Sequence, residues 1–453
     1  MYNYTLPNGL PGGSRAAWSN LPLRSLIAGP LTPFSYSLIA EIAGRAWYHY
    51  FDQLGFDPMP RARVVRQYQG WPFLNLTLSA QRDAEGAAIE PLSLCLDGRP
   101  FPICKWEKPG LLAGLKFALA QGKVDTLLKS YRSDVETLLQ QAQSWLNKVA
   151  DYRWTQAEVL QIMEEIESVG GRSMTVWLAA RHNLDLAYNR LIRLAAERAG
   201  YPAALALIDK ATGDEGLVER MIFDRLAALA EAARSPAVHQ WLASGQLDNW
   251  AATIPSPALA GELERFLASF GHRCLQEGEI RYPRWGDEPA SLFRLLLAVT
   301  DGATQLPERE AADLQPLLAA VAAGQRKEAQ QLLQKIAQLR TLQSQALHAL
   351  AYILAGTRRW ALAAARDAMA DGRLSAADDV FFYELEEVKE MMTGEWNISK
   401  RTEIRSTGQK RKAQYAEWQQ ATPPDLLIGE SEAVSNQPAP PWSFCGGLAL
   451  LGQ

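Results

Sequence analysis

Apolar residues recur at helical spacing over a long stretch that begins near residue 123. They follow alternating intervals of three and four over about three heptads, and side chains at these intervals share one face of a helix. The stretch therefore predicts one long helix with a buried face. Its apolar positions are Leu128, Tyr131, Val135, Leu138, Ala142, Trp145 and Val149.

Capping signals divide the next part of the chain into helices. Thr155 and Glu158 have the spacing of a capping box, which predicts a helix that begins at Thr155. Gly170 and Gly171 predict its end, since glycine is typical of helix C-termini. Further helices are expected at about 173–198, 203–211, 215–234, 236–244 and 257–270, and a later apolar face comprises Leu332, Ile336, Leu339, Leu342, Leu347, Leu350, Ile353 and Leu354.

Residues 1–120 have a different pattern, with prolines throughout. Proline interrupts regular structure, so only short elements are expected there. One helix is predicted from Thr32 or Ser35 to His49. The stretch 63–78 is rich in β-branched and aromatic residues, which predicts one or two short strands.

The fold class that follows is mainly α, a multi-helix substrate-binding domain with a short irregular, β-containing N-terminal segment. We expect residues 1–120 to pack on a helical body at 121–428. Residues 429–441 have the composition of a linker. The remaining residues, 442–453, are too few for a domain of their own.

Composition adds little to this picture but excludes several kinds of partner. The 453 residues carry 46 Lys and Arg against 50 Asp and Glu, a net charge of −4, so we expect no nucleic-acid partner and no membrane partner. No segment has the ~18 uninterrupted apolar residues of a membrane span. The four cysteines show no paired spacing and fit a reducing compartment, so a cytoplasmic protein is expected.

Several standard catalytic motifs are missing from the sequence. It contains no phosphate-binding Gly-x-x-x-x-Gly-Lys-Ser/Thr loop, no dinucleotide fingerprint and no nucleophile elbow. The five histidines do not stand at metal-ligand spacing, so no metal site is expected on this chain. They are His49, His182, His239, His272 and His348.

The densest polar stretch is residues 270–289, where glycines and prolines disfavour a plain helix. Such a loop can place a titratable histidine beside guanidinium groups suited to an oxyanion. The alternative is structural, with two arginines paired to two glutamates in a buried loop. The residues concerned are His272, Arg273, Glu277, Glu279, Arg281, Arg284 and Trp285.

Two further segments are candidates for anion binding. Pro30 and Pro33 stiffen a turn before the first predicted helix, where Thr32 could simply cap the helix or the helix N-terminus could hold an anion. Arg358 and Arg359 could bind a phosphate or form an ordinary solvated helix face.

Aromatic residues suggest a separate possibility, an apolar cavity for a ligand, although core packing explains most of them. The residues concerned are Trp47, Tyr48, Tyr50, Phe51, Trp71, Met174 and Trp177.

Taken in order, these segments resemble the substrate-binding middle domain of the dikinase-like phosphotransferases, the group related to phosphoenolpyruvate synthase that includes rifampin phosphotransferase. The resemblance covers nearly all of residues 20–428. It is carried by Leu26-Ile-Ala-Gly-Pro-Leu-Thr-Pro-Phe-Ser-Tyr-Ser-Leu38, Gln69-Gly-Trp-Pro-Phe-Leu-Asn75, Phe270-Gly-His-Arg273, Glu277-Gly-Glu279, Pro283-Arg-Trp285, Asp378-Asp-Val-Phe-Phe382 and Pro423-Pro424.

The resemblance implies a chain that holds the hydroxyl of a small-molecule substrate for phosphoryl transfer. In complete family members an ATP-grasp domain precedes this region, and a swivelling domain with a phosphorylated histidine follows it. We expect both on partner proteins, with ATP and Mg²⁺ on a partner chain and no cofactor on this one. The segment 442–453 resembles the first strand of a swivelling domain, and the chain is expected to be inactive alone, as a split subunit or a truncated remnant.

Roles for individual residues follow as hypotheses. His272 or Glu279 is expected to accept the proton of the substrate hydroxyl. Arg273, Arg358 or Arg359 is expected to hold the phosphoryl oxygens. The other residues expected to contact substrate are Pro30, Thr32, Arg281, Arg284 and Trp285.

Two functions from other classes remain open at this point. One is a non-catalytic helical protein that binds an apolar or aromatic ligand in the aromatic-lined cavity. The other is a helical-repeat scaffold for proteins, which would be elongated.

Overall fold

The computed structural model describes most of the chain. The residues described are 16–56, 63–87, 93–96, 99–102, 111–150, 155–245, 247, 249–308, 311–394, 400–429 and 432–435. The segment 442–453, with its resemblance to a swivelling-domain strand, lies outside them.

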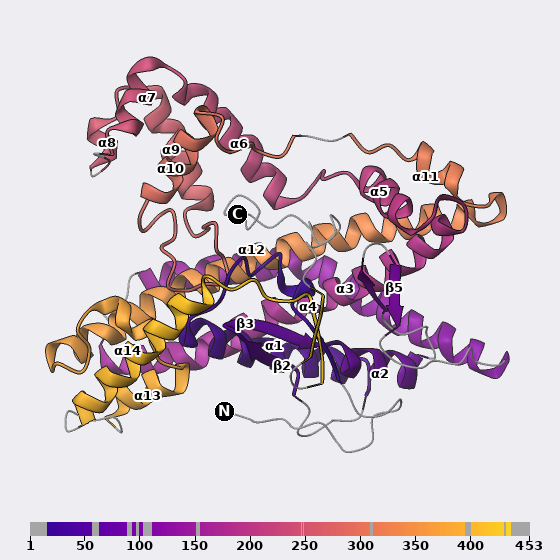
Figure 1. Ribbon diagram of the computed structural model, residues 1–453, viewed down its shortest axis with the longest axis horizontal. Helices are drawn as coiled ribbons and strands as arrows, with labels where there is room; N and C mark the ends of the chain where they lie inside the picture. The colour runs from indigo at the N-terminus through magenta and orange to yellow at the C-terminus, as the bar shows by residue number, and fades with distance from the viewer. Residues whose placement is uncertain are drawn as a thin grey trace.

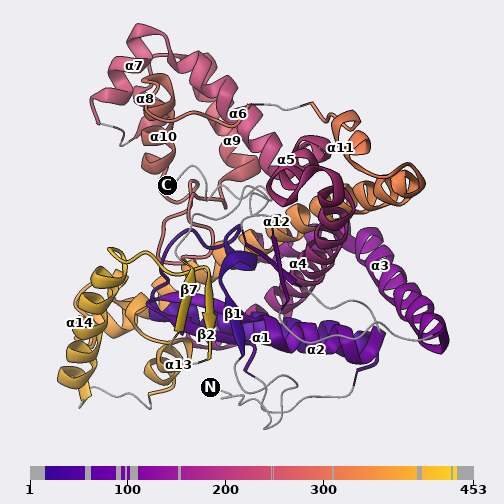
Figure 2. The same cartoon turned by 45° about the vertical axis from the view of Figure 1, so that its right-hand side comes forward.

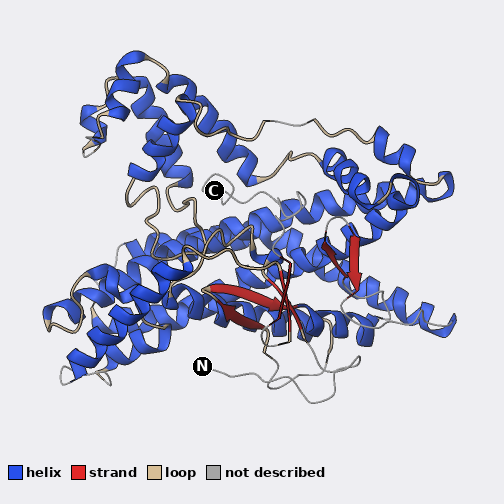
Figure 3. Cartoon of the chain, viewed as in Figure 1, coloured by secondary structure: helices blue, strands red, loops and turns tan. Residues whose placement is uncertain are grey.

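Long helices form the body of the molecule and confirm the mainly α fold class (Figures 1 and 3). Helices α3 (Leu111–Ala150) and α4 (Gln156–Ala199) both pack against α12 (Arg326–Ala370). Helix α3 confirms the helix predicted from its apolar spacing, although it begins before residue 123. Its predicted inward face is buried at Leu128, Val135 and the later apolar positions.

Helix α4 begins as its capping box predicts. The hydroxyl of Thr155 accepts the backbone N–H of Glu158, and the Glu158 carboxylate accepts the backbone N–H of Thr155 at 2.7 Å. These bonds satisfy donors that the first turn of a helix leaves without partners.

The helix break predicted at Gly170 and Gly171 is wrong, because α4 continues through both residues and ends before Gly200. A Cβ atom at Gly170 would lie 3.2 Å from a methyl carbon of Ile353 on α12. Gly170 therefore allows α4 and α12 to pack closely, and it does not end a helix.

The two ends of the described chain meet in one antiparallel sheet (Figure 2). Trp18 of the central strand pairs with Asn75 on one side and with Leu427 on the other. The last strand lies within the range expected to be a linker, where it pairs with its neighbour. In spatial order the strands are β2 (Val65–Tyr68), β3 (Trp71–Asn75), β1 (Ala17–Ser19), β6 (Leu426–Ile428) and β7 (Glu432–Ser435).

Helix α1 (Pro33–Gln53) packs on α4 and confirms the helix predicted in the N-terminal segment. The β2–β3 hairpin likewise confirms the predicted strands. The remaining elements of this segment are the 3₁₀ turn η1 (Leu21–Leu23), α2 (Leu76–Ala87), β4 (Ser93–Leu96) and β5 (Arg99–Pro102).

A group of shorter helices, here called the small lobe, stands apart from the body at the top of Figure 1. It buries its own apolar cluster, which includes Phe266 and Phe293 and is distinct from the core of the body. Its helices are α6 (Val218–Ala233), α7 (Pro236–Ala243), α8 (Trp250–Thr253), α9 (Pro257–Phe270) and α10 (Ala290–Thr300). On the body side of its two connections lie α5 (Tyr201–Thr212) and α11 (Gln315–Ala320).

The helical elements that follow α12 pack against the body. They are the 3₁₀ turn η3 (Ala377–Phe382), α13 (Leu385–Thr393) and α14 (Arg401–Trp418). Arg411 on the last helix pairs with Glu387 at 2.5 Å and so ties α14 to α13. The 3₁₀ turn η2 (Ala323–Gln325) comes directly before α12. In the described part of the chain, no helix combines the length and apolarity needed to cross a membrane.

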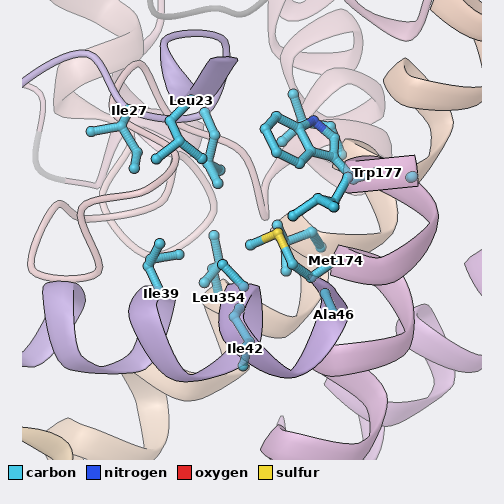
Figure 4. Close-up of a cluster of buried hydrophobic side chains, with 14 of the residues drawn as sticks. Leu23, Ile27, Ile39, Ile42, Ala46, Met174, Trp177 and Leu354 are labelled. Carbon is cyan, nitrogen blue, oxygen red and sulfur yellow. The ribbon is translucent and has the colours of Figure 1, made fainter. Parts of the chain in front are cut away.

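The core of the body joins segments that are distant in sequence (Figure 4). Side chains from the N-terminal turn lie over α1 and meet α4 and α12, and each is at most 2% exposed. Burying side chains of this kind contributes about 1.5–3 kcal/mol each. The labelled residues are Leu23, Ile27, Ile39, Ile42, Ala46, Met174, Trp177 and Leu354.

Two glycine substitutions test the helix packing. A Cβ at Gly356 would lie 2.3 Å from a ring carbon of Trp145, so Gly356→Ala should destabilise the protein by about 1–3 kcal/mol through overpacking. At Gly171 nothing lies within 4 Å of the added carbon. Gly171→Ala should therefore stabilise the continuous helix by about 0.5–1 kcal/mol. Chemical denaturation of both variants measures the two effects, and a loss of stability in Gly171→Ala would contradict a continuous α4.

Candidate functional site

The loop 271–289 lies between the small lobe and the body, where it links α9 to α10. It folds back on itself at Gly286, whose N–H donates to the carbonyl of Gly271 at 2.6 Å. It is joined to the N-terminal segment at Gly278, whose N–H donates to the carbonyl of Leu26 at 2.8 Å. A Cβ at Gly278 would lie 2.9 Å from that carbonyl oxygen, so only glycine permits this contact.

Glu279 fixes the loop to the start of α1. Its carboxylate accepts the N–H of Thr32 at 2.7 Å and the hydroxyls of Thr32 and Ser35 at 2.9 and 2.7 Å. It also accepts the N–H of Arg281 at 2.8 Å. Thr32 is the N-cap of α1, as capping predicts, but its hydroxyl bonds Glu279 and makes no capping bond to the helix.

This position suits a carboxylate, because helix N-termini favour negative charge. Burial raises the pKa of Glu279, and the hydrogen bonds from Thr32 and Ser35 oppose that rise. With four donors already on its two oxygens, Glu279 is a structural acceptor in this arrangement. His272 is the better placed of the two expected bases.

Arg273 is wholly buried and joins three elements. Its guanidinium donates to Glu277 in the loop at 2.5 Å, to Glu219 on α6 at 3.3 Å and to His348 Nδ1 on α12 at 3.1 Å. Burial disfavours its charge, but Glu277 and Glu219 hold the pKa of Arg273 above its usual value. The structural alternative is thus confirmed for Arg273 and Glu277. For the second expected pair it is wrong, because the Arg281 side chain pairs with Asp378 and only its backbone N–H bonds Glu279.

The neighbouring arginine, Arg284, is almost as deeply buried, at 1% exposure, but binds no carboxylate. Its guanidinium donates to the sulfur of Cys274 at 2.6 Å and to the backbone carbonyl of Glu277 at 3.2 Å, and its Nε has no acceptor. Burial raises the pKa of the Cys274 thiol, so the sulfur is neutral near pH 7 and carries no negative charge to offset that of Arg284.

Arg358 on α12 is in a similar position. Its NH1 donates to the backbone carbonyls of Ile280 and Arg281, its Nε has no acceptor, and the side chain binds no carboxylate directly. Burial and the positive charge of Arg284 lower the pKa of Arg358. Arg284 and Arg358 are thus two buried guanidinium groups that each have an Nε without an acceptor, and their positive charges interact.

A cluster of two imidazoles and a phenol lies beside Arg273. Nε2 of His272 lies 3.3 Å from Nδ1 of His348, and the His272 ring stacks on Tyr352 with centroids 3.6 Å apart. Burial, His348 and Arg273 lower the pKa of His272 well below its usual value. Burial and Arg273 lower the pKa of His348 to about 3, so both rings are neutral near pH 7.

The remaining predicted residues lie at the edge of this cluster or beneath it. Arg281 pairs with Asp378 at 3.4 Å, and Arg359 pairs with Asp287 at 3.3 Å, both with side chains about one-third exposed. Trp285 is wholly buried and packs on Phe266 in the core of the small lobe.

Pro30 lies against the turn of the β2–β3 hairpin. A Cβ at Gly70, where φ is +79°, would lie 2.8 Å from Pro30 and 2.7 Å from the ring of Trp418. Leu31 donates its N–H to the carbonyl of Gly70 at 2.9 Å. The hairpin therefore fixes the turn that leads to Thr32.

The structure thus brings together segments that the sequence offered separately, the turn before α1, the loop 271–289 and the arginines of α12. Sequence reasoning missed His348, Tyr352 and Glu219 as members of the cluster. The one local signal was His348, a titratable residue between the apolar positions Leu347 and Leu350 of α12.

No group of three or more metal-ligating side chains occurs among the residues that the structure describes. A small cavity of about 30 Å³ is lined by Trp47, Trp177 and His182 among others, with room for a water or two. The other aromatic residues proposed to line a cavity pack in or against the core of the body.

The comparison with protein families matches residues 172–367 to the family described as "Rifampicin phosphotransferase fourth domain". The resemblance is confirmed over this segment. The matched segment contains the whole loop, the His348 cluster and both arginines of α12, but not Pro30 or Thr32. No curated protein matches the chain.

Replacing Glu279 tests its structural role. In Glu279→Gln the charge is lost and an NH₂ group faces the donors of Thr32 and Ser35, so the free energy of unfolding should fall by about 2–3 kcal/mol. Glu288→Gln, at an exposed position of the same loop, should change it by less than about 0.5 kcal/mol. Urea denaturation compares the two, and equal effects would refute the anchoring role.

The neutral histidine pair should make folding acid-sensitive. The pKa values of both histidines are lower in the folded than in the unfolded state. Their contribution to the free energy of unfolding is therefore fully present above pH 6.5 and is lost as the pH falls below it. The expected slope is about 1.4 kcal/mol per pH unit for each histidine. The double variant His272→Gln/His348→Gln should flatten this slope, whereas His239→Gln, exposed and paired with Asp301, should not. Denaturation at a series of pH values measures it.

Proposed function

We propose that this chain holds a small-molecule alcohol for phosphoryl transfer from a phosphohistidine that lies outside this sequence. The alcohol would sit at His272, and the phosphoryl oxygens would bind Arg358 and Arg284. The proposal rests on the match to a phosphotransferase domain and on one structural observation, the pair of buried guanidinium groups without carboxylate partners.

A buried charge without a partner is costly, commonly by several kcal/mol. Arg284 and Arg358 are 1% and 8% exposed. Their hydrogen-bond acceptors are backbone carbonyls and a neutral thiol, and Arg358 also lies over the ring of Phe381. A phosphoryl group carries two negative charges and accepts hydrogen bonds from guanidinium groups in a fork geometry. It would supply the acceptors that the two Nε atoms lack.

Arg273 is less suited to this role than Arg358, although both were candidates. Its guanidinium is already shared among Glu277, Glu219 and His348. Arg359 is paired with Asp287 at the surface. Arg281 and Arg359 would therefore form the rim of the site, with Arg284 and Arg358 beneath it.

In the proposed reaction, a phosphoryl group moves from a histidine nitrogen to the substrate oxygen. The substrate oxygen forms a bond to phosphorus, the phosphorus–nitrogen bond of the phosphohistidine breaks, and its electron pair returns to that imidazole. The hydroxyl proton passes to His272, which is neutral and can accept it. A phosphoryl dianion beside the ring would raise the pKa of His272, because it offsets the nearby positive charges.

The donor histidine must come from elsewhere under this proposal. His49, His182 and His239 contact Gln53, Asp83 and Asp301, and the other two form the cluster itself. The ATP-grasp and phosphohistidine proteins, with ATP and Mg²⁺, are the proposed partners.

Anion binding gives the first test. Arg358→Met should weaken the binding of inorganic phosphate about 10- to 100-fold, since a charge-assisted hydrogen bond is worth about 1.5–3 kcal/mol. Arg366→Met, at an exposed position further along α12, is the matched control and should change the affinity by no more than about twofold. Isothermal titration calorimetry measures both, and Arg358→Lys, which keeps the charge, should lose less affinity than Arg358→Met.

Reconstitution gives the second test. The chain is incubated with ATP, Mg²⁺, an ATP-grasp protein and a phosphohistidine protein encoded beside it, and with a hydroxyl compound. Rifampicin, named in the description of the matched family, is the first compound to try. Formation of AMP and a phosphorylated alcohol is expected. If the chain binds neither protein and no phosphoryl transfer occurs, the proposal is refuted.

The alternative of an apolar-ligand protein gains no support from the cavity at Trp47 and Trp177. Its volume of about 30 Å³ is well below that of an engineered cavity of about 150 Å³ that admits benzene.

A further inference from the structure

The His272–His348 contact fixes where protons lie in the cluster. A guanidinium group is always a donor, so NH1 of Arg273, 3.1 Å from Nδ1 of His348, must donate to that atom. Nδ1 of His348 therefore carries a lone pair, and its proton is on Nε2. The choice of tautomer follows from the neighbouring arginine and does not depend on assumed hydrogen positions.

The same lone pair determines the tautomer of His272. Its Nε2 lies 3.3 Å from Nδ1 of His348. If Nε2 also carried a lone pair, two acceptors would face each other, so a favourable contact requires the proton on Nε2. The single lone pair of His348 Nδ1 is then shared by two donors, NH1 of Arg273 at 3.1 Å and Nε2 of His272 at 3.3 Å. A neutral imidazole has one donor nitrogen and one acceptor nitrogen, which leaves the free lone pair of His272 on Nδ1.

The ring of His272 is also held in its plane. It stacks on Tyr352 with an interplanar angle of 13°, while His348 meets Tyr352 at 60°. No hydrogen bond to Nδ1 of His272 is formed by any residue that the structure describes. His272 retains 7% of its surface, so the ring is packed but not sealed.

We propose that His348 is a positioning residue, whose Nδ1 accepts the Nε2–H of His272 and thereby makes Nδ1 of His272 the atom that receives the substrate proton. This inference rests on the proposed function and adds the identity of the accepting atom and of the residue that selects it. Arg273 is the second positioning residue, because it compels Nδ1 of His348 to act as an acceptor.

A catalytic base is commonly oriented by a hydrogen bond to a second side chain, and His348 would orient His272 in this way. The substrate oxygen must approach from the Nδ1 side of His272, since the Nε2 side is occupied by His348. The proton moves from the hydroxyl to Nδ1 as the oxygen–phosphorus bond forms and the phosphorus–nitrogen bond of the donor breaks. His272 then carries a proton on both nitrogens until solvent removes one.

Nitrogen NMR of the full chain labelled with ¹⁵N-histidine tests the tautomer without any activity. The signals of His272 are assigned by their loss in His272→Gln. In the wild type, Nδ1 of His272 should be unprotonated and Nε2 protonated near pH 7. A protonated Nδ1, or an imidazolium, would overturn the proposal.

Variants at position 348 test the positioning role. His348→Leu removes the acceptor, so the two tautomers of His272 should become mixed. His348→Asn keeps an acceptor oxygen near the position of Nδ1 and should restore the wild-type tautomer. An unchanged tautomer in His348→Leu would show that His348 does not select it and would overturn the proposal.

The reconstituted transfer assay distinguishes this inference from the proposed function. His348→Leu should lower kcat about 10- to 100-fold, because mixing the tautomers removes only part of the roughly 10²- to 10⁴-fold that an oriented acid or base contributes. KM should change little, and His348→Asn should recover most of the loss. If the wild type shows transfer but His348→Leu retains full kcat, the positioning role is refuted and the proposed function stands. If NMR finds the expected tautomer but the wild type transfers nothing, the proposed function fails and the base role of Nδ1 fails with it.

Discussion

The buried guanidinium of Arg273 is the contact on which the candidate site depends. It carries a full charge at 0% exposure, and two carboxylates, one from its own loop and one from α6, stabilise it there. Removing either carboxylate would leave an uncompensated buried charge, which is strongly destabilising. Arg273 also donates to His348 on α12, so the same residue joins the small lobe to the body and contacts the histidine pair.

Charge is distributed unevenly around this contact. The charge of Arg273 is balanced by two carboxylates. Arg284 and Arg358 instead donate hydrogen bonds to backbone carbonyls and a thiol. The carboxylate of Glu279 is taken up by the N-terminus of α1 and by the backbone N–H of Arg281. The region therefore combines a neutral imidazole pair with two buried guanidinium groups, and the proposed function rests on this combination.

Much of the candidate site could be predicted from the sequence, because many of its residues are close together in the chain. His272, Arg273, Glu277 and Glu279 fall in one loop, and the pairing of Arg273 with Glu277 was an expected alternative. The order of the motifs supported the resemblance that the family match confirms over residues 172–367. The false break at Gly170 shows the limit of local signals, because a glycine that ends a helix and one that admits a neighbouring helix look the same in sequence.

The sequence by itself determined most of the long helices, the short strands near Gly70 and the position of the loop, since spacing, capping and turn chemistry are local properties. Only the tertiary structure decided which polar groups became partners. Nothing local connects Glu279 to Thr32, or Arg273 to His348 75 positions away. Whether an arginine is paired or left with unsatisfied donors depends on which side chains packing brings within about 3 Å, and that distance is set by the whole fold.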